Sequence, residues 1–252
     1  MYQEYPPDMR LSHLIETYWT FDGIITTPHS HSVLPDGCVD IIFDFGGNDG
    51  TGVLNTGQPE LVGTMTSALE VSYNTGRIQM MGIRFAPAGI TAFTKMPVFE
   101  FTNQSITLPL SETMFDKSFY ERLPDMNSMR ERINYLNRYF LTTLHKLYIP
   151  NKQIEYAVTM IQRNNGQLSV RRIAEEVYLC ERHFERKFKS AVGLSPKTFS
   201  NVMRFNYTRQ YIKSHKEESL FSTSIACGYH DLAHMNKDFQ RFSNSAPSEL
   251  TR

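Results

Sequence analysis

The sequence has little cysteine and no long apolar run, and both shortages exclude whole classes of protein. Its three cysteines, Cys38, Cys180 and Cys227, are an odd number without a CxxC spacing, which excludes a disulfide framework and a cysteine zinc site. No apolar run approaches the roughly 20 residues of a membrane span. The first ten residues, MYQEYPPDMR, lack the basic and apolar regions of a signal peptide. We expect a cytoplasmic protein with reduced, mostly buried thiols.

Net charge is also absent, since 26 Lys and Arg balance 26 Asp and Glu, and overall neutrality by itself argues against a nucleic-acid partner. The charge is unevenly placed, however. Residues 1–150 hold 10 basic and 16 acidic residues, a balance of −6, whereas residues 151–252 hold 16 and 10, a balance of +6. Such an asymmetry indicates that the second part meets a polyanion and the first does not.

The first hundred residues have the pattern of short strands. The β-branched or aromatic runs lie at 39–45, 61–65, 69–75 and 77–85 and are bounded by Gly, Pro, Asn and Asp. They predict a curled antiparallel sheet. The glycine-rich segment 46–52 is predicted to be a mobile hairpin tip, because no Lys-Ser/Thr pair follows it as in a phosphate-binding loop.

A helical period follows from about residue 110. Ser128 and Glu131 predict a capping box, and an apolar stripe then runs through Met129, Ile133, Leu136, Phe140, Leu144 and Leu147. The stripe favours packing against the preceding sheet or the next domain over a second interpretation, a dimerisation helix. Pro150 is expected to end the helix, since it has no N–H to donate, and the domain boundary is placed there.

The last hundred residues contain an internal repeat with a spacing of 51. Phe184, Phe188, Gly193, Pro196 and Phe199 correspond to Met235, Phe239, Asn244, Pro247 and Leu250, and His183 corresponds to His234. Each copy has the pattern of two short helices joined by a turn. The predicted N-caps are Ser169 in the first copy and Asp231 in the second. Ser195 and Pro196 start a connecting helix that reaches about Lys213.

These strings resemble the AraC/XylS family of bacterial transcription regulators. SVRRIAEEVYLCERHFERKFKSAVGLSPKTFSNVMRFNYTRQYI is similar to that family's first helix-turn-helix and linker helix, and CGYHDLAHMNKDFQRFSNSAPSEL to its second. The sequence departs from the family at Met235, at Thr223 and Ser224 in the scaffold helix, and at Asn244 and Ala246. The second unit is therefore expected to bind DNA less firmly. The resemblance implies double-stranded DNA, RNA polymerase and a small-molecule effector as partners, with homodimerisation, no catalysis, no cofactor and no membrane contact.

The amino-terminal strings LPDGCVDIIFDF, LVGTMT and MGIRFAPAGITAF resemble a cupin-like domain of uncharacterised role that precedes such regulators. The expected fold is α+β and multidomain: a cupin-like antiparallel β-barrel or sandwich, then an all-α domain. We expect a sensor or dimerisation domain at 1–122, a connector helix at 123–150 and a DNA-binding domain at 151–252. Within the last domain the helix-turn-helix units are expected at about 169–192 and 221–243, joined by a linker helix at about 196–213.

The resemblance also implies which residues meet DNA, because the second helix of each unit enters the major groove in that family. In the first unit, Arg182, His183 and Arg186 are carried over as base readers, with Lys187 and Lys189 on phosphates. In the second unit, the corresponding set is His234, Asn236, Lys237 and Arg241, and Ala233 offers only an apolar contact. A solvated basic helix face remains the alternative for both sets.

The sequence also leaves two alternatives open for the amino-terminal domain. His29 and His31, with Asp36 and Asp40 nearby, have the spacing of a metal-binding cupin enzyme, but a carboxylate and a later His of that pattern are missing. The second alternative is an effector pocket lined by aromatic side chains, for which the candidates are Tyr18, Trp19, Phe21, Phe43 and Tyr73. A packed core is the other interpretation of the aromatic set.

Overall fold

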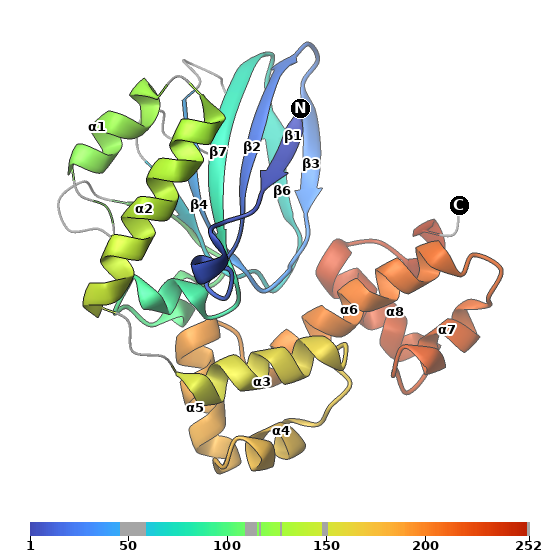
Figure 1. Ribbon diagram of the computed structural model, residues 1–252. Coiled ribbons are helices and arrows are strands. Elements are labelled where there is room, and N and C mark those ends of the chain that lie inside the picture. The colour runs from blue at the N-terminus through green and yellow to red at the C-terminus, as the bar shows by residue number, and fades with distance from the viewer. Residues whose placement is uncertain (46–58, 109–114, 116, 127, 148–150, 251–252) are drawn as a thin grey trace. The chain divides into compact units, whose positions relative to one another are not determined.

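The computed structural model describes residues 1–45, 59–108, 115, 117–126, 128–147 and 151–250 (Figure 1). Residue contacts divide the chain into two compact units. The amino-terminal unit comprises residues 1–31, 38–63 and 71–150, and the carboxyl-terminal unit comprises residues 32–37, 64–70 and 151–252. The predicted hairpin tip at 46–52 and Pro150 lie outside the described residues. Of the helices in the described ranges, none has the length and apolar character needed to cross a membrane.

The amino-terminal unit is built on a six-stranded sheet with the strand order β1-β2-β7-β4-β5-β8, and β3 and β6 pair in a separate two-stranded sheet. Neighbouring strands of the larger sheet pair antiparallel. The strands are β1 (Tyr2–Tyr5), β2 (Ile15–Ile25), β3 (His29–Val33), β4 (Val39–Asp44), β5 (Glu60–Val62), β6 (Leu69–Tyr73), β7 (Gly76–Phe85) and β8 (Ser105–Thr107). The sheet-rich domain expected from the strand-like runs is confirmed, since β4, β5, β6 and β7 lie on those runs.

The larger sheet has two different faces because successive side chains of a strand point in opposite directions. Tyr18 of β2 lies in the main core with Ile83 and Phe85 of β7. Its neighbour Trp19 lies in a second, smaller cluster on the other face. The indole fits there because Gly82 is its partner across the ladder, where an added Cβ would come within 2.0 Å of the ring.

Helices cover one face of the larger sheet (Figure 1). They are α1 (Lys117–Asp125) and α2 (Met129–Leu147), with the 3₁₀ turns η1 (Met9–Leu11), η2 (Gly89–Ala92) and η3 (Val98–Phe101). Leu136 and Phe140 of the predicted stripe are fully buried in the core, and the Phe140 ring lies 4.7 Å from that of Phe93. The stripe therefore packs on this unit's own core, as the favoured interpretation predicted.

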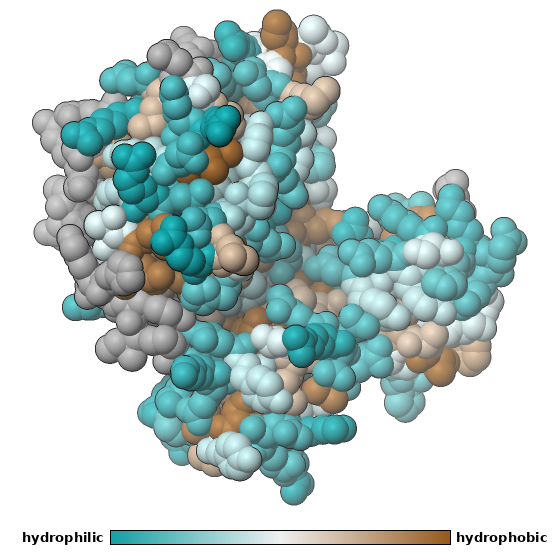
Figure 2. All heavy atoms as spheres, in the orientation of Figure 1, coloured by the Kyte–Doolittle hydropathy of each residue, from teal (hydrophilic) through white to brown (hydrophobic). Residues whose placement is uncertain are grey.

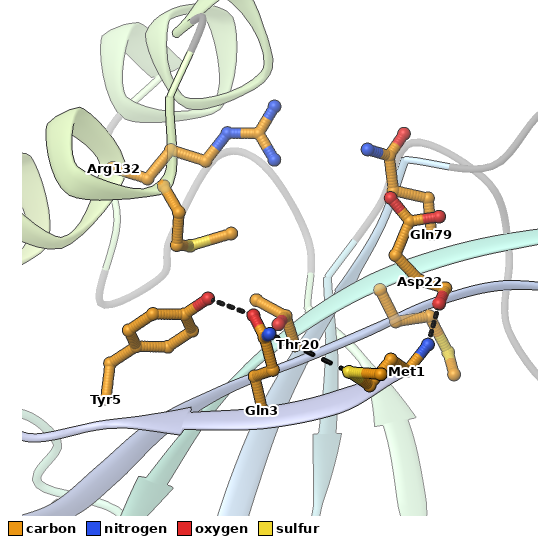
Figure 3. Close-up of a pocket in the computed structure, with 9 residues that line it drawn as sticks. Met1, Gln3, Tyr5, Thr20, Asp22, Gln79 and Arg132 are labelled. Carbon is orange, nitrogen blue, oxygen red and sulfur yellow. Dashed lines mark hydrogen bonds between the residues drawn. The ribbon is translucent and has the colours of Figure 1, made fainter.

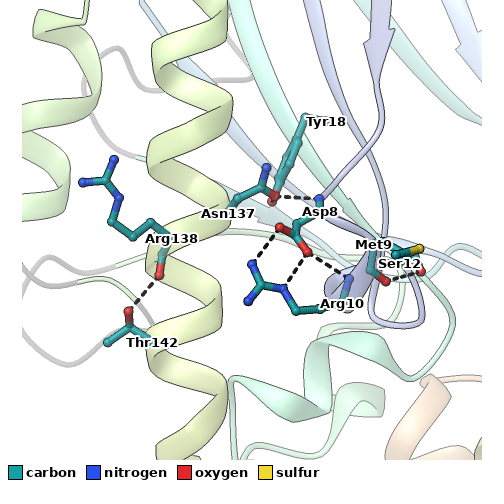
Figure 4. A network of polar contacts seen from close by, with 8 residues as sticks. All are labelled: Asp8, Met9, Arg10, Ser12, Tyr18, Asn137, Arg138 and Thr142. Atoms are coloured by element: carbon teal, nitrogen blue, oxygen red, sulfur yellow. Dashed lines mark hydrogen bonds and ion pairs between the residues drawn. The ribbon is translucent and has the colours of Figure 1, made fainter.

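Polar contacts also fix α2 to the sheet (Figure 4). The Asn137 Oδ1 atom accepts hydrogen bonds from the Asp8 backbone N–H at 2.9 Å and from the Tyr18 hydroxyl at 3.0 Å. At the start of the helix, the Glu131 backbone N–H donates to Ser128 Oγ at 3.3 Å. This bond is one half of the predicted capping box. Helix α2 is thus held at its N-terminus and at its middle.

The described residues from 151 onward are helical. Their elements are α3 (Lys152–Arg163), α4 (Val170–Glu176), α5 (Glu181–Val192), α6 (Pro196–Ser214), α7 (Leu220–Ala226), α8 (Leu232–Ser243) and the turn η4 (Pro247–Leu250). The α4–α5 and α7–α8 pairs are the two predicted helix-turn-helix units. Helix α6 contacts α3 and α5 as well as α7 and α8, so one long helix packs against both units. The all-α expectation for this region is confirmed.

Candidate nucleic-acid interface

Helix α5 is anchored by two aromatic side chains and presents basic side chains on another side. Phe184 and Phe188 are fully buried with ring centroids 5.5 Å apart. Arg182, Arg186 and Lys189 are exposed. Positions separated by four and three residues share a helix face, so these three cations form one row. Helix α5 therefore has an apolar side that anchors it and an exposed side that carries these three cations.

Two other residues expected to meet DNA are less open. His183 and Lys187 are half-buried. The Lys187 ammonium donates to Gln153 Oε1 of α3 at 3.4 Å, and the Gln153 amide in turn donates to the Val177 carbonyl at 2.7 Å. This chain of contacts ties α5 to α3 and to the turn after α4. A phosphate contact by Lys187 therefore competes with an internal one and stays a prediction.

Helix α8 repeats the arrangement with different side chains. Met235 and Phe239 are buried, and the Phe239 ring packs edge-on to Phe205 of α6 at 4.9 Å. The exposed positions hold Ala233, Asn236, Lys237, Gln240 and Arg241. The outer face of α8 therefore has two cations and three uncharged residues. In Figure 2, hydrophilic side chains cover most of the visible face of the carboxyl-terminal helices.

The half-buried His234 is part of an internal polar cluster, which the sequence did not reveal. Arg204 of α6 donates through Nη2 to Asp238 Oδ2 at 3.2 Å, and both side chains are about nine-tenths buried. The same nitrogen lies 3.4 Å from His234 Nε2. Arg204 of α6 thus contacts two side chains of α8 through one nitrogen. The repeat offered one signal for this cluster, because it places the acidic Asp238 at the position where the first copy has the basic Lys187.

Tyr229 completes the cluster. The Arg204 guanidinium lies 4.5 Å from the Tyr229 ring centroid, and the His234 ring packs edge-on to the same ring at 5.2 Å. Burial and the nearby Asp238 carboxylate raise the pKa of the Tyr229 hydroxyl to about 12, so the hydroxyl keeps its proton at neutral pH. The His234 ring therefore packs against Tyr229 and contacts Arg204 of α6. To read a base, the same ring would have to contact DNA in addition to these internal partners.

The helix caps follow the predicted residues. Ser169 and Ser195 accept from backbone amides at the starts of α4 and α6, and Asp231 accepts from the His234 amide at 2.7 Å. This bond, together with a hydrogen bond from the His230 ring, lowers the pKa of the Asp231 carboxyl. Asn244 takes the left-handed conformation with φ 52°, where the first copy has Gly193 with φ 87°. Asn244 departs from the family's residue, but it ends α8 with the same left-handed conformation by which Gly193 ends α5.

The residues of the metal alternative are not brought together. Among the described residues, no three His, Cys, Asp or Glu side chains form a group that fits a metal ion. The Asp40 carboxylate accepts from the Trp19 indole at 2.7 Å and from Arg84 at 3.3 Å, and the His29 ring packs against Tyr73 at 5.5 Å. Cys38 and Cys227 are buried and Cys180 is exposed, and none of the three takes part in a disulfide. The predicted mostly buried thiols are confirmed.

The hypothesis of one pocket lined by five aromatic residues is wrong. Tyr18 and Phe43 lie in the main core, whereas Trp19, Phe21 and Tyr73 lie in the second cluster. The cause is the alternation of side chains along β2, which sends adjacent aromatic residues to opposite faces of one sheet. These side chains are packing residues of two separate layers.

Comparison with known proteins matches two separate parts of the chain to two different families. Residues 173–252 match a family described as a helix-turn-helix domain, and residues 3–107 match a domain of unknown function, DUF6597. The HTH-type transcriptional activator RhaS of Escherichia coli (strain SE11) is 30% identical over 78 residues, which is 31% of this chain and 28% of RhaS. The chain therefore matches less than a third of the length of that curated relative.

The fold as a whole is also similar to a solved structure. The 1.65 Å structure of ToxT from Vibrio cholerae superposes with a TM-score of 0.50 at 12% identity, covering 93% of this chain and 97% of that one. A likeness at this identity establishes the fold alone: a sheet-rich domain followed by a helical one. Taken together with the two family matches, the carboxyl-terminal part of the chain holds two helix-turn-helix units and is similar to a helix-turn-helix domain family, and the part before it is similar to the DUF6597 domain.

Proposed function

We propose that the protein is a sequence-specific DNA-binding transcription regulator that places α5 and α8 in successive major grooves of one duplex. The observation that carries this proposal is the repeated helix pair in which buried side chains anchor the second helix and its exposed side holds Arg182, Arg186 and Lys189 or Asn236, Lys237 and Arg241. A helix of this kind fits the major groove, where Arg and Asn distinguish base edges.

The length of α6 supports simultaneous binding by both units. Its 19 residues correspond to about 28 Å at 1.5 Å per residue. Successive major grooves on one side of a duplex are roughly 34 Å apart. Because α6 packs against the helices of both units, the unit widths supply the remaining distance. The balance of +6 for residues 151–252 supplies the attraction to phosphates.

The amino-terminal part is proposed to control this activity without catalysing a reaction. We assign residues 1–122 to sensing or dimerisation, residues 123–150 to the connection and residues 151–252 to DNA binding. In this role a small molecule or a second copy of the chain acts on the first part, and RNA polymerase is recruited in the cytoplasm. The name of the curated relative, a transcriptional activator, favours activation. A run-off transcription assay with purified polymerase, with and without the protein, tests activation. Transcript levels that the protein leaves unchanged would contradict activation.

The experiment that tests DNA binding is a titration of the full chain against fluorescent duplexes at several salt concentrations. The duplexes are the DNA upstream of its own gene and a scrambled sequence of the same composition. We expect tighter binding to the upstream DNA and a linear fall of log K with log salt concentration. Equal affinity for both duplexes, or no binding at low salt, would contradict the proposal.

The competing function is a metal-dependent cupin-type enzyme with an appended helical domain. The pairing of His29 and His31 on one strand is its remaining support. Elemental analysis of the purified protein discriminates the two functions, because a metal enzyme would contain close to one equivalent of a transition metal. Loss of that metal in a His29→Ala, His31→Ala variant would favour the enzyme.

A further inference from the structure

A cavity of about 260 Å³ lies in the amino-terminal unit, beside the first turns of α2 (Figure 3). Its polar lining includes Gln3, Thr20 and Gln79 from three strands, and its apolar lining includes Met80 and Met129. Arg132 of α2 reaches it from the helix side, and Asp22 lies across from Arg132 (Figure 3). None of the aromatic candidates from the sequence contributes to it.

Arg132 is the unusual member of this lining. One of its terminal nitrogens donates to the Pro124 carbonyl at 3.3 Å, and the guanidinium lies 4.5 Å from the Phe45 ring centroid. Its Nε atom is buried and makes no hydrogen bond to any described residue. None of the described carboxylates pairs with it, and burial lowers the pKa of the guanidinium. Within the part of the chain that the structure describes, the half-buried Arg132 guanidinium thus lines the cavity without being paired to a carboxylate.

An uncompensated cation of this kind is costly unless an anion joins it. A guanidinium matches a carboxylate by two parallel hydrogen bonds. Asp22, across the cavity, already faces Arg77 at 3.7 Å and would repel a second negative charge on the occupant. The occupant is therefore a monoanion. Methionine side chains adapt to varied apolar shapes, so its remaining part is apolar.

We propose that this cavity binds a small organic monocarboxylate, with the carboxylate on Arg132 and the apolar part against Met80 and Met129. Its volume is below the roughly 300–1,000 Å³ of ordinary ligand sites, which limits the occupant to a compact molecule. The assignment gives a chemical class to the small-molecule effector and in that sense rests on the proposed function. Occupancy of the cavity itself requires no DNA.

Hexanoate, hexan-1-ol and hexylamine form a matched set of probes, because they share a chain and differ in the head group. We expect calorimetry on the unaltered full chain to show saturable binding of hexanoate, which also raises the melting temperature, and no binding of the alcohol or the amine. Arg132→Met should weaken hexanoate binding at least about tenfold. The matched control is Arg138→Met, an exposed arginine on the same helix, which should leave the affinity unchanged.

Several results would overturn the proposal. They are equal binding of hexanoate and hexan-1-ol, an affinity that Arg132→Met does not change, and no saturable binding of hexanoate up to about 10 mM. The head-group comparison needs no variant, so it remains decisive if Arg132→Met fails to fold. DNA binding is titrated separately without hexanoate, so failure of the carboxylate site and failure of the proposed function are distinguishable.

Discussion

The two helix-turn-helix units share a backbone pattern and differ in how that backbone is held. In the first unit, the scaffold helix buries Ile173 and Ala174; in the second, it buries Thr223 and Ser224 at the corresponding positions. The Ser224 hydroxyl is satisfied by the Phe221 carbonyl at 2.7 Å. The second unit gains in addition the buried Arg204–Asp238 pair. A repeated fold can thus keep its geometry while its interior changes from apolar to polar.

The turns differ as well. Positions 169–179 of the first unit correspond to 219–229 of the second with a spacing of 50, since Ser169 and Ser219 both cap their helices. From Cys180 and Asp231 onward the spacing is 51, so the second turn is one residue longer. The repeat with a spacing of 51 that the sequence shows therefore applies to the second helix of each unit and not to the first. Four predictions test how far these differences separate the units.

The largest expected effect concerns the buried ion pair. Arg204→Ala leaves Asp238 buried without its partner, which costs about 3–5 kcal/mol. In the first unit, Lys187 lies at the position that corresponds to Asp238 and makes one 3.4 Å contact as a half-buried side chain, so Lys187→Ala should cost about 1 kcal/mol or less. Chemical denaturation of both variants checks the difference. A double variant, Arg204→Met with Asp238→Leu, should recover most of the loss, and an equal cost for the two single variants would refute the distinction.

The second prediction concerns the DNA-facing sides. Arg186→Ala should cost about 1–3 kcal/mol at a single base position, whereas Lys189→Ala should weaken binding to all sequences and flatten the salt dependence. Lys237→Ala, at the position that corresponds to Arg186, should cost less, because a lysine lacks the bidentate fork. Titration against cognate and random duplexes checks this. Equal losses on both duplexes for Arg186→Ala would show that it does not read bases.

The third prediction concerns the left-handed residue in each turn. Tyr178 has φ 56° and Gly228 has φ 76°, and the Tyr178 side chain is 92% exposed. Relief of the backbone strain makes Tyr178→Gly stabilising by up to about 1 kcal/mol. Gly228→Ala should destabilise by about 1 kcal/mol or more, since its Cβ would also come within 2.9 Å of the Gln167 side chain. Thermal unfolding measures both, and the same sign for both changes would contradict the comparison.

The smallest expected effect concerns the caps of α5 and α8. Asp231 caps α8 through its carboxylate, whereas Cys180 makes no capping bond at α5. Because the pKa of Asp231 is lowered in the folded state, its contribution is present above its ordinary pKa of 3.8 and is lost as the pH falls through the lower folded value. Acid should therefore reduce the stability difference between the wild type and Asp231→Asn.

The matched change is Cys180→Asp, which supplies the missing cap and should stabilise the first unit by about 0.5–1 kcal/mol at neutral pH. That gain should likewise decrease in acid, because the new carboxylate must be ionised to act fully. Unfolding curves at neutral pH and near pH 3 give both differences. A gain that is the same at both pH values would show that charge at this position is unimportant.

Much of the helical part was predictable because its signals are local. A cap and a proline at a helix start depend only on neighbours in the chain, and Ser195 and Pro196 start α6 as predicted. The sheet was less predictable. Strand β2, of 11 residues, was not among the predicted runs, because it mixes aromatic, acidic and glycine residues whose environment depends on strands far away in sequence.

The sequence by itself determined the helical period and the caps, because these are set by residues within a few turns of one another. It also determined the repeat and the uneven charge, because both follow from comparing and counting residues along the chain. Only the tertiary structure decided which side chains share an environment. It separated Tyr18 from Trp19 on two faces of one sheet, joined Arg204 to Asp238 across 34 residues and placed Arg132 at a cavity. Contacts between distant segments depend on how whole elements pack, and no local pattern specifies that packing.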